Sequence, residues 1–145
     1  QIMSAVRTAS DSAEVANQVR SMLNTRGLPD AQIQSQIEQM TSPWFRFFVR
    51  YDPAPTLRQV DVPVLALYGS KDLQVPPEQN APPMRAALRS SPSDDVTVRV
   101  LDGLNHLFQP AETGLPTEYA QIETTMAPRA LEAVAAWIRA RTAVN

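Results

Sequence analysis

The chain has 145 residues, no cysteine, and 13 Lys and Arg against 15 Asp and Glu, for a formal net charge of -2. The lack of cysteine excludes disulfides, thiol nucleophiles and cysteine metal sites. The nearly balanced charge, without a run of either sign, argues against nucleic acid as a partner. No apolar run approaches the roughly 18 residues that span a bilayer, so we expect no membrane partner either.

Residues 11–50 have the pattern of successive amphipathic helices. Asp11 and Glu14 are spaced as a helix-capping pair, apolar residues follow at helical spacing, and Gly27 offers a C-terminal stop. We therefore expect residues 1–50 to form a helical, cap-like segment. Two further helix starts are predicted, one at Pro29 and Asp30 and the other where Ser42 caps and Pro43 occupies the first turn.

The third of these helices carries an aromatic cluster. Aromatic side chains dominate burial energetics, so a cluster of this kind is more often a core or a helix-packing surface than a ligand site. The functional alternative is the wall of a substrate pocket, which would be formed by Trp44, Phe45, Phe47 and Phe48.

Residues 51–145 have a different pattern, which predicts strand, helix, strand and helix in an α/β sheet. After a linker at 52–55 that is expected to be extended, the apolar run 62–68 ends at Gly69 and is typical of a strand covered on both faces. The next predicted element is a helix from Pro76 and Pro77 to Leu88, whose prolines are expected only in or near its first turn. Two parallel strands leave both sheet edges unpaired, so something must complete the sheet. The elements after this helix are predicted as a strand at 96–101 and a helix from Pro128.

Two polar side chains follow the predicted strands. Asp72 comes after the first strand, and His106, the only histidine, comes after the second. Loops at the carboxyl ends of parallel strands converge, so the carboxylate can accept a hydrogen bond from the imidazole and fix its tautomer. Taken separately, each has an ordinary role: His106 as a hydrogen-bonding loop residue, and Asp72 as a turn cap or a surface partner of Lys71. Neither role explains why both loops carry such a residue.

These loops resemble the last two strands of α/β-hydrolases. The resemblance rests on Gly69-Ser70-Lys71-Asp72 with Val75-Pro76, on Gly103-x-Asn105-His106, and on the closing helix, and it covers residues 40–141. It implies the C-terminal portion of an α/β-hydrolase fold, with Asp72 and His106 as the acid and histidine of a Ser-His-Asp triad. The stretch Phe108-Gln109 and residues 114–126 look like an esterase-like or serine-peptidase-like bacterial subgroup. The implied substrate is a small acyl compound, most simply a carboxylic ester, and no cofactor is implied.

The nucleophile of that family has no counterpart in this chain. A nucleophile elbow needs small residues, usually glycine, two positions before and after the serine, and none of the four glycines is so placed. Ser70 lies beside Lys71 outside a strand-elbow-helix setting, so we interpret it as a turn residue that shapes the acid loop. Because the chain opens at Gln1, we expect the serine and the oxyanion donors in a missing N-terminal part of the same protein. The chain alone is then expected to be inactive.

Two other interpretations remain. A metal site could combine His106 with Glu112, Asp102 or Glu118, although a single nitrogen ligand is poor zinc chemistry. Alternatively, the chain is a non-catalytic α/β interaction module that pairs through its exposed sheet edge with another chain, a second copy of itself included.

Overall fold

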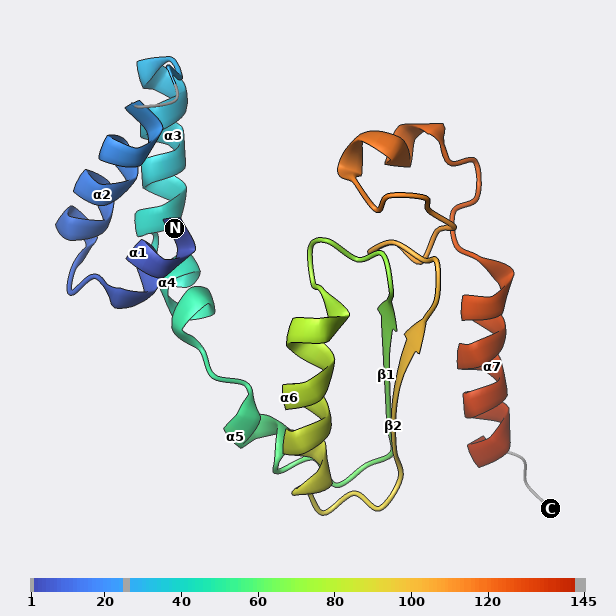
Figure 1. The fold of residues 1–145 in the computed structure, drawn as a ribbon. Coiled ribbons are helices and arrows are strands. Elements are labelled where there is room, and N and C mark those ends of the chain that lie inside the picture. Colours follow the sequence, from blue (N-terminus) through green and yellow to red (C-terminus); the bar gives the residue numbers. More distant parts are fainter. Residues whose placement is uncertain (1, 25–26, 143–145) are drawn as a thin grey trace. The chain divides into compact units, whose positions relative to one another are not determined.

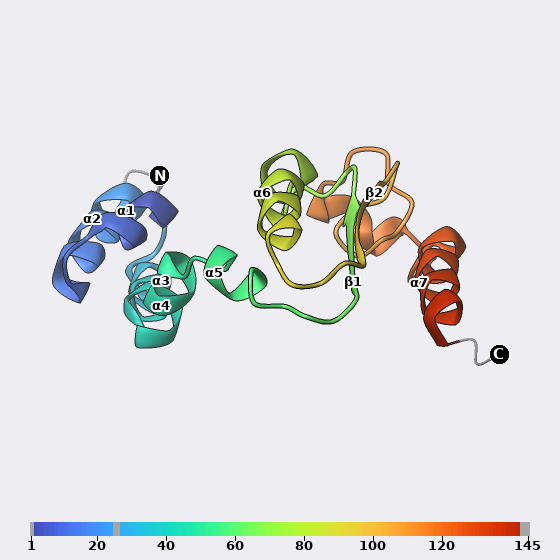
Figure 2. The same cartoon turned by 90° about the horizontal axis from the view of Figure 1, so that it is seen from below.

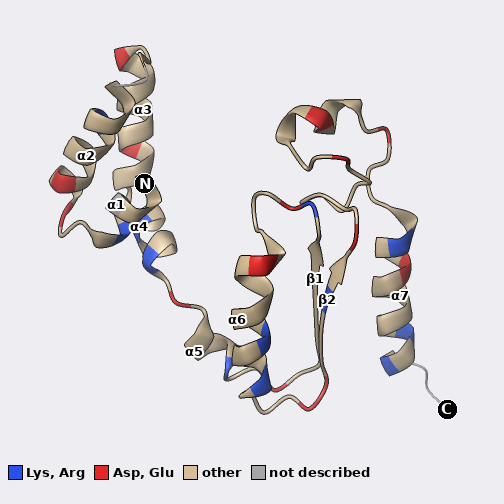
Figure 3. Ribbon diagram, viewed as in Figure 1, with Lys and Arg blue, Asp and Glu red and all other residues tan. Residues whose placement is uncertain are grey.

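The computed structural model describes residues 2–24 and 27–142, which form two compact units, Gln1–Asp52 and Pro53–Asn145. The first unit is all helical and the second contains a two-stranded parallel sheet, so the chain as a whole combines helices with a small α/β unit (Figure 1). Acidic and basic residues are interspersed along both units, without a long segment of one sign (Figure 3). Within the described ranges, no helix has the length and apolar content to cross a membrane.

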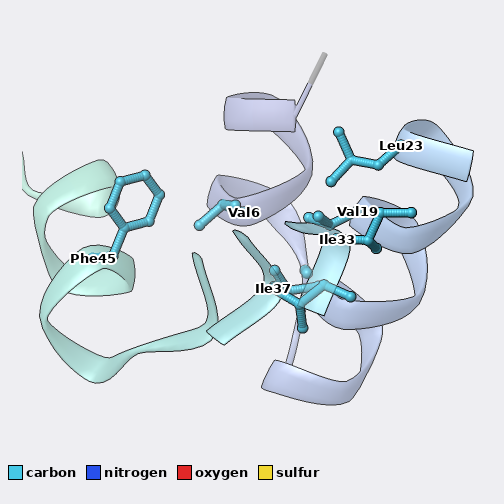
Figure 4. Close-up of a cluster of buried hydrophobic side chains, with 8 residues drawn as sticks. Val6, Val19, Leu23, Ile33, Ile37 and Phe45 are labelled. Carbon is cyan, nitrogen blue, oxygen red and sulfur yellow. The ribbon is translucent and has the colours of Figure 1, made fainter. Parts of the chain in front are cut away.

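The helical unit contains α1 (Ile2–Thr8), α2 (Ser12–Asn24), α3 (Asp30–Thr41) and α4 (Pro43–Arg50). Both predicted caps are confirmed, because Asp11 Oδ1 accepts from the Glu14 N–H at 2.8 Å and Ser42 Oγ accepts from the Phe45 N–H at 3.2 Å. Residues 1–50 were expected to be helical, but the sequence pattern assigned no separate helix to the residues that form α1. The buried side chains of the four helices, with Ala9 from the connection between α1 and α2, form one core, seen in Figure 4: Val6, Ala9, Val15, Val19, Leu23, Ile33, Ile37 and Phe45.

The second unit begins with α5 (Ala54–Leu57), a single helical turn where the sequence predicted extended chain. That expectation was wrong because a proline in the first turn of a helix gives up an N–H that has no intrahelical partner in any case. The prediction for the next helix, α6 (Pro77–Arg89), was wrong in a similar way, since Pro82 and Pro83 lie inside it. Both prolines are exposed, so water can reach the backbone carbonyls that they leave without a partner.

The sheet pairs β1 (Val64–Gly69) with β2 (Val96–Leu101) in parallel, with Val64 opposite Val96 and Gly69 opposite Leu101. In both views the sheet lies between α6 on one side and α7 (Pro128–Thr142) on the other (Figures 1 and 2). A short 3-10 helix, η1 (Pro116–Gln121), lies in the long connection before α7.

Burial in the sheet unit is incomplete. The sequence predicted a first strand covered on both faces, but the part of β1 from Val64 to Leu67 is only half-buried. Apolar residues of α7 are also exposed, with Leu131 at 55% and Ile138 at 46%. The expectation failed because the buried cluster on this side is small, consisting of Leu101, Leu104, Ala127 and Ala130 with Leu67 and Phe108 beside them.

Candidate functional site

The two loops predicted to carry chemistry lie against each other at the carboxyl ends of the strands. The Ser70 N–H donates to the Leu101 carbonyl at 2.9 Å, and the Lys71 N–H donates to the Leu104 carbonyl at 2.8 Å. Parallel pairing brings both strand ends to one edge of the sheet, and these two bonds continue the contact past the last paired residues. The acid loop (residues 70–76) and the histidine loop (residues 102–110) are therefore held together by backbone hydrogen bonds.

Asp72 and His106 meet at this edge. The distance from His106 Nδ1 to Asp72 Oδ2 is 2.9 Å, and the Asp72 side chain is only 7% exposed. A carboxylate has no proton to donate, so the imidazole Nδ1 carries the proton and its N–H donates a hydrogen bond to Asp72 Oδ2. This arrangement leaves His106 Nε2 as the lone-pair nitrogen of the neutral ring.

The remaining oxygen of Asp72 is held by its own loop. Asp72 Oδ1 accepts from the Gln74 N–H at 2.9 Å and from the Val75 N–H at 2.8 Å. Asp72 is thus a turn cap through one oxygen and the partner of His106 through the other. The turn fixes the carboxylate plane, so the orientation of Oδ2 toward the histidine loop follows from local backbone structure.

His106 is open on its other side. Its side chain is 37% exposed, and Nε2 has no hydrogen-bond partner in the described parts of the chain. An imidazole with a carboxylate on Nδ1 and an accessible Nε2 can take a proton from an incoming group, because the carboxylate stabilises the resulting cation. The chemical capacity of the site is therefore that of a general base.

Ser70 joins the two loops through its side chain. Ser70 Oγ donates to Asp102 Oδ1 at 3.0 Å and accepts from the Gly103 N–H at 2.7 Å. With both hydroxyl functions used, Ser70 occupies the structural role that its sequence setting predicted. The Arg129 guanidinium, from α7, also donates to the Asp102 carbonyl.

The Glu118 carboxylate, one of the candidate metal ligands, is engaged within its own segment. The Glu118 carboxylate accepts from the Thr113 hydroxyl and from the backbone N–H groups of Glu112 and Thr113, and these bonds, the hydroxyl first, lower the Glu118 pKa. Across 2–24 and 27–142, no group of three or more His, Cys, Asp and Glu side chains is placed to hold a metal ion. The metal alternative has no support from the described geometry.

The segment around η1 packs on the acid loop. Gln74 Nε2 donates to the Tyr119 hydroxyl at 3.1 Å, and Gly114 lies so close to the Lys71 carbonyl that a side chain there would collide with it. Gly114 has a φ of +79°, which favours glycine for the same position. Residues 114–119 thus contact the acid loop through both a side chain and the backbone.

The four aromatic residues proposed for a substrate pocket divide into two environments. Phe45 is 8% exposed and belongs to the core of the helical unit, whereas Trp44, Phe47 and Phe48 are more than half exposed. Trp44 and Phe48 stack with centroids 5.4 Å apart, so α4 presents an aromatic face. A role for these side chains in a pocket stays a prediction.

An apolar groove of about 550 Å³ lies between the sheet and α7. Its walls come from both elements and from the histidine loop: Pro63, Val64, Leu65, Leu67, Phe108, Val134, Trp137 and Ile138. The groove exists because α7 leaves much of the facing side of β1 uncovered.

Two buried amides beside His106 had no role assigned from the sequence. Asn105 is fully buried and Gln109 is 7% exposed, and their side chains are hydrogen-bonded to each other. The available signal was the spacing, since an asparagine and a glutamine four residues apart enclose the histidine within an otherwise apolar loop.

Comparison of the chain with models of protein families, with curated proteins and with solved structures gave no match.

Proposed function

We propose that Asp72 and His106 are the acid and the base of a Ser-His-Asp triad, and that residues 51–145 are the C-terminal part of an α/β-hydrolase-type serine hydrolase. The observation that carries the proposal is the 2.9 Å contact between His106 Nδ1 and a nearly buried carboxylate, with Nε2 left accessible. The parallel order of the strands and the position of both residues just past the strand ends support the same proposal.

The roles of the two residues follow from their atoms. His106 Nε2 removes the proton of the serine hydroxyl as the serine oxygen attacks the acyl carbon, and the imidazolium then gives that proton to the leaving alcohol or amine. Asp72 holds the Nδ1–H tautomer and stabilises the imidazolium without itself becoming protonated. A water activated by His106 then cleaves the acyl-enzyme and regenerates the serine.

We propose that the serine and the oxyanion donors come from a polypeptide segment outside these 145 residues, because the sequence contains no nucleophile elbow. The substrate is a small acyl compound, a carboxylic ester in the first instance and a peptide bond in the second.

The first test is intact-mass analysis of the chain after treatment with a fluorophosphonate, which labels activated serines. The chain alone should gain no adduct. An adduct would mean that an activated serine lies within the chain and would overturn the assignment of the nucleophile to an outside segment.

The second test adds any coding sequence that precedes residue 1 in the gene, fused or as a separate chain. The combined protein should hydrolyse p-nitrophenyl esters and should lose that activity with His106→Ala, while His106→Ala leaves the folded structure measured by circular dichroism unchanged. Hydrolysis that survives His106→Ala would overturn the triad.

The apolar groove favours a second candidate function, that of a non-catalytic module that pairs through its sheet edge. In a two-stranded sheet each strand has one unpaired edge, and β1 is flanked by the uncovered groove. Pairing with a second copy should appear as concentration-dependent mass in light scattering, and Ile138→Glu, at an exposed groove position, should abolish it. A chain that remains monomeric over the whole concentration range would exclude self-pairing.

A further inference from the structure

The histidine loop is closed by a buried pair of amides. Asn105 Nδ2 donates to Gln109 Oε1 at 3.0 Å, and the Asn105 N–H donates to the Gln109 carbonyl at 3.0 Å. The two residues are therefore joined through both side chain and backbone, and the three residues between them, His106 included, form the closed part of the loop.

Asn105 also fixes the inside of that loop. Its Oδ1 accepts from the Leu107 N–H at 2.9 Å and from the Gln109 N–H at 3.0 Å, while its carbonyl accepts from the Phe108 N–H at 3.0 Å. Phe108 has a φ of +57°, an unfavourable value for a residue with a side chain, and it is held there by these bonds. Every backbone N–H from Leu107 to Gln109 is thus satisfied by Asn105.

These hydrogen bonds differ from those of an ordinary surface turn because they are buried. Asn105 is 0% exposed, so bulk water cannot replace a hydrogen-bond partner that its side-chain amide loses. The carbonyl of Asn105 lies directly against Gly69, at the end of the strand that leads to Asp72. The peptide that carries His106 is consequently held between the amide pair on one side and the base of the acid loop on the other.

From this geometry we infer that Asn105 and Gln109 are positioning residues that hold His106 Nδ1 on Asp72 Oδ2. The inference rests on the proposed function, since it assigns these residues to the triad's histidine. Their action is indirect, because their side chains are buried and hydrogen-bond to each other and to the loop backbone. Without the Gln109 amide, Asn105 Nδ2 loses its acceptor, the loop relaxes, and His106 exchanges its contact with Asp72 for solvent.

The test uses the fact that His106 is the only histidine, so that one set of imidazole signals reports on the site. The tautomer of the neutral ring is read from its ¹⁵N chemical shifts at alkaline pH in the labelled 145-residue chain. Held on Asp72, the ring carries its proton on Nδ1, whereas a ring released to water favours the Nε2–H form. Gln109→Met, which keeps the volume and removes the acceptor, should lower the ratio of Nδ1–H to Nε2–H by about tenfold, the effect expected when a buried polar group loses its only partner.

Gln109→Glu preserves the acceptor oxygen and should retain the Nδ1–H form. Gln79→Met, at an exposed position of α6, is the matched control and should leave the ratio unchanged. If Gln109→Met does not fold, as judged by its amide spectrum, Gln109→Ser provides the second variant, because its short side chain stays polar but removes the amide oxygen that accepts from Asn105 Nδ2. The serine variant should again reduce the Nδ1–H form.

The outcomes separate this inference from the proposed function. A wild-type ring that is not protonated on Nδ1 would overturn the Asp72–His106 pair and with it the triad. A wild-type Nδ1–H form that persists in folded Gln109→Met or Gln109→Ser would overturn the positioning role and leave the triad standing.

Discussion

Gly69 lies with its Cα against the carbonyl of Leu104, so that the end of β1 and the histidine loop are in backbone-to-backbone contact. A Cβ on residue 69 would lie 2.5 Å from the Asn105 carbonyl oxygen and closer still to that of Leu104, distances that no side chain can occupy. The hydrogen bond from the Lys71 N–H to the same Leu104 carbonyl depends on this approach. The absence of a side chain at residue 69 is therefore what lets the two loops converge.

Gly69→Ala should separate the loops. We expect a loss of roughly 1–3 kcal/mol of stability in the second unit, because the obstructing atoms are backbone and cannot rotate away, together with a weaker Nδ1–H signal from His106. Thermal unfolding followed by circular dichroism measures the first effect and ¹⁵N NMR the second. Gly27→Ala, where nothing lies within 4 Å, is the control and should leave the His106 signal intact. A Gly69→Ala chain with wild-type stability and tautomer would contradict the account of the contact.

Asp72→Asn should separate the two functions of this side chain. Asparagine Oδ1 can still accept from the Gln74 and Val75 N–H groups, so we expect the acid loop to keep its turn. Its Nδ2, however, donates to the imidazole, so Nδ1 must become an acceptor and the proton moves to Nε2. ¹⁵N NMR of the imidazole should show this change of tautomer in a folded chain. An unchanged Nδ1–H form would mean that Asp72 does not set the tautomer.

The Ser70 hydroxyl should contribute measurably to the contact between the loops. Ser70→Ala leaves the Gly103 N–H without its acceptor and should lower the free energy of unfolding by about 1 kcal/mol. A double-mutant cycle with Asp102→Ala isolates the hydroxyl-carboxylate bond from the N–H bond. Strictly additive effects of the two substitutions would show that Ser70 and Asp102 do not interact in solution.

Two neighbouring phenylalanines of α4 should differ sharply in their effect on stability. Phe45→Ala removes a side chain from the core of the helical unit and should cost about 3–5 kcal/mol. Phe48→Ala, on the exposed face, should change stability by less than about 0.5 kcal/mol. Chemical denaturation of each variant measures the difference. Equal effects would mean that α4 packs through the other face.

The attachment of α7 near the start of β2 should weaken in acid. The Arg141 guanidinium is hydrogen-bonded to the Asp95 carboxylate, which holds the Asp95 pKa below its ordinary value. A lowered pKa in the folded state means that the bond stabilises above the ordinary carboxyl pKa of about 3.9 and is lost as the pH falls through the lower folded value. Trp137 fluorescence reports this change, since the Arg141 guanidinium lies 3.9 Å from its ring centroid.

This measurement is made in a Trp44→Phe background, which leaves Trp137 as the only tryptophan. The transition below pH 4 should vanish in Arg141→Gln and should shift with added salt because the pair is partly exposed. A transition of the same midpoint in Arg141→Gln would assign it to another group.

The local elements were largely predictable because their signals are short in range. The caps at Asp11 and Ser42, the β-branched run of β2 and the proline that opens α7 each depend on neighbours within a few residues. The sequence-based predictions failed where the structure depends on how much of an element is exposed to solvent. Pro82 and Pro83 remain inside α6 because solvent reaches the carbonyls around them, and the apolar pattern of β1 and α7 did not reveal that much of both would stay uncovered.

By itself, the sequence determined the two loops and the identity of the side chains that they carry, since a strand followed by Asp72 and a strand followed by His106 can be recognised from local patterns. Only the tertiary structure decided that Asp72 directs one oxygen to its own turn and the other to His106, and that Asn105 and Gln109 close the loop around the histidine. The physical reason is that hydrogen bonds are directional over a few ångströms. Their partners are therefore selected by the approach of the two strand ends, which Gly69 permits.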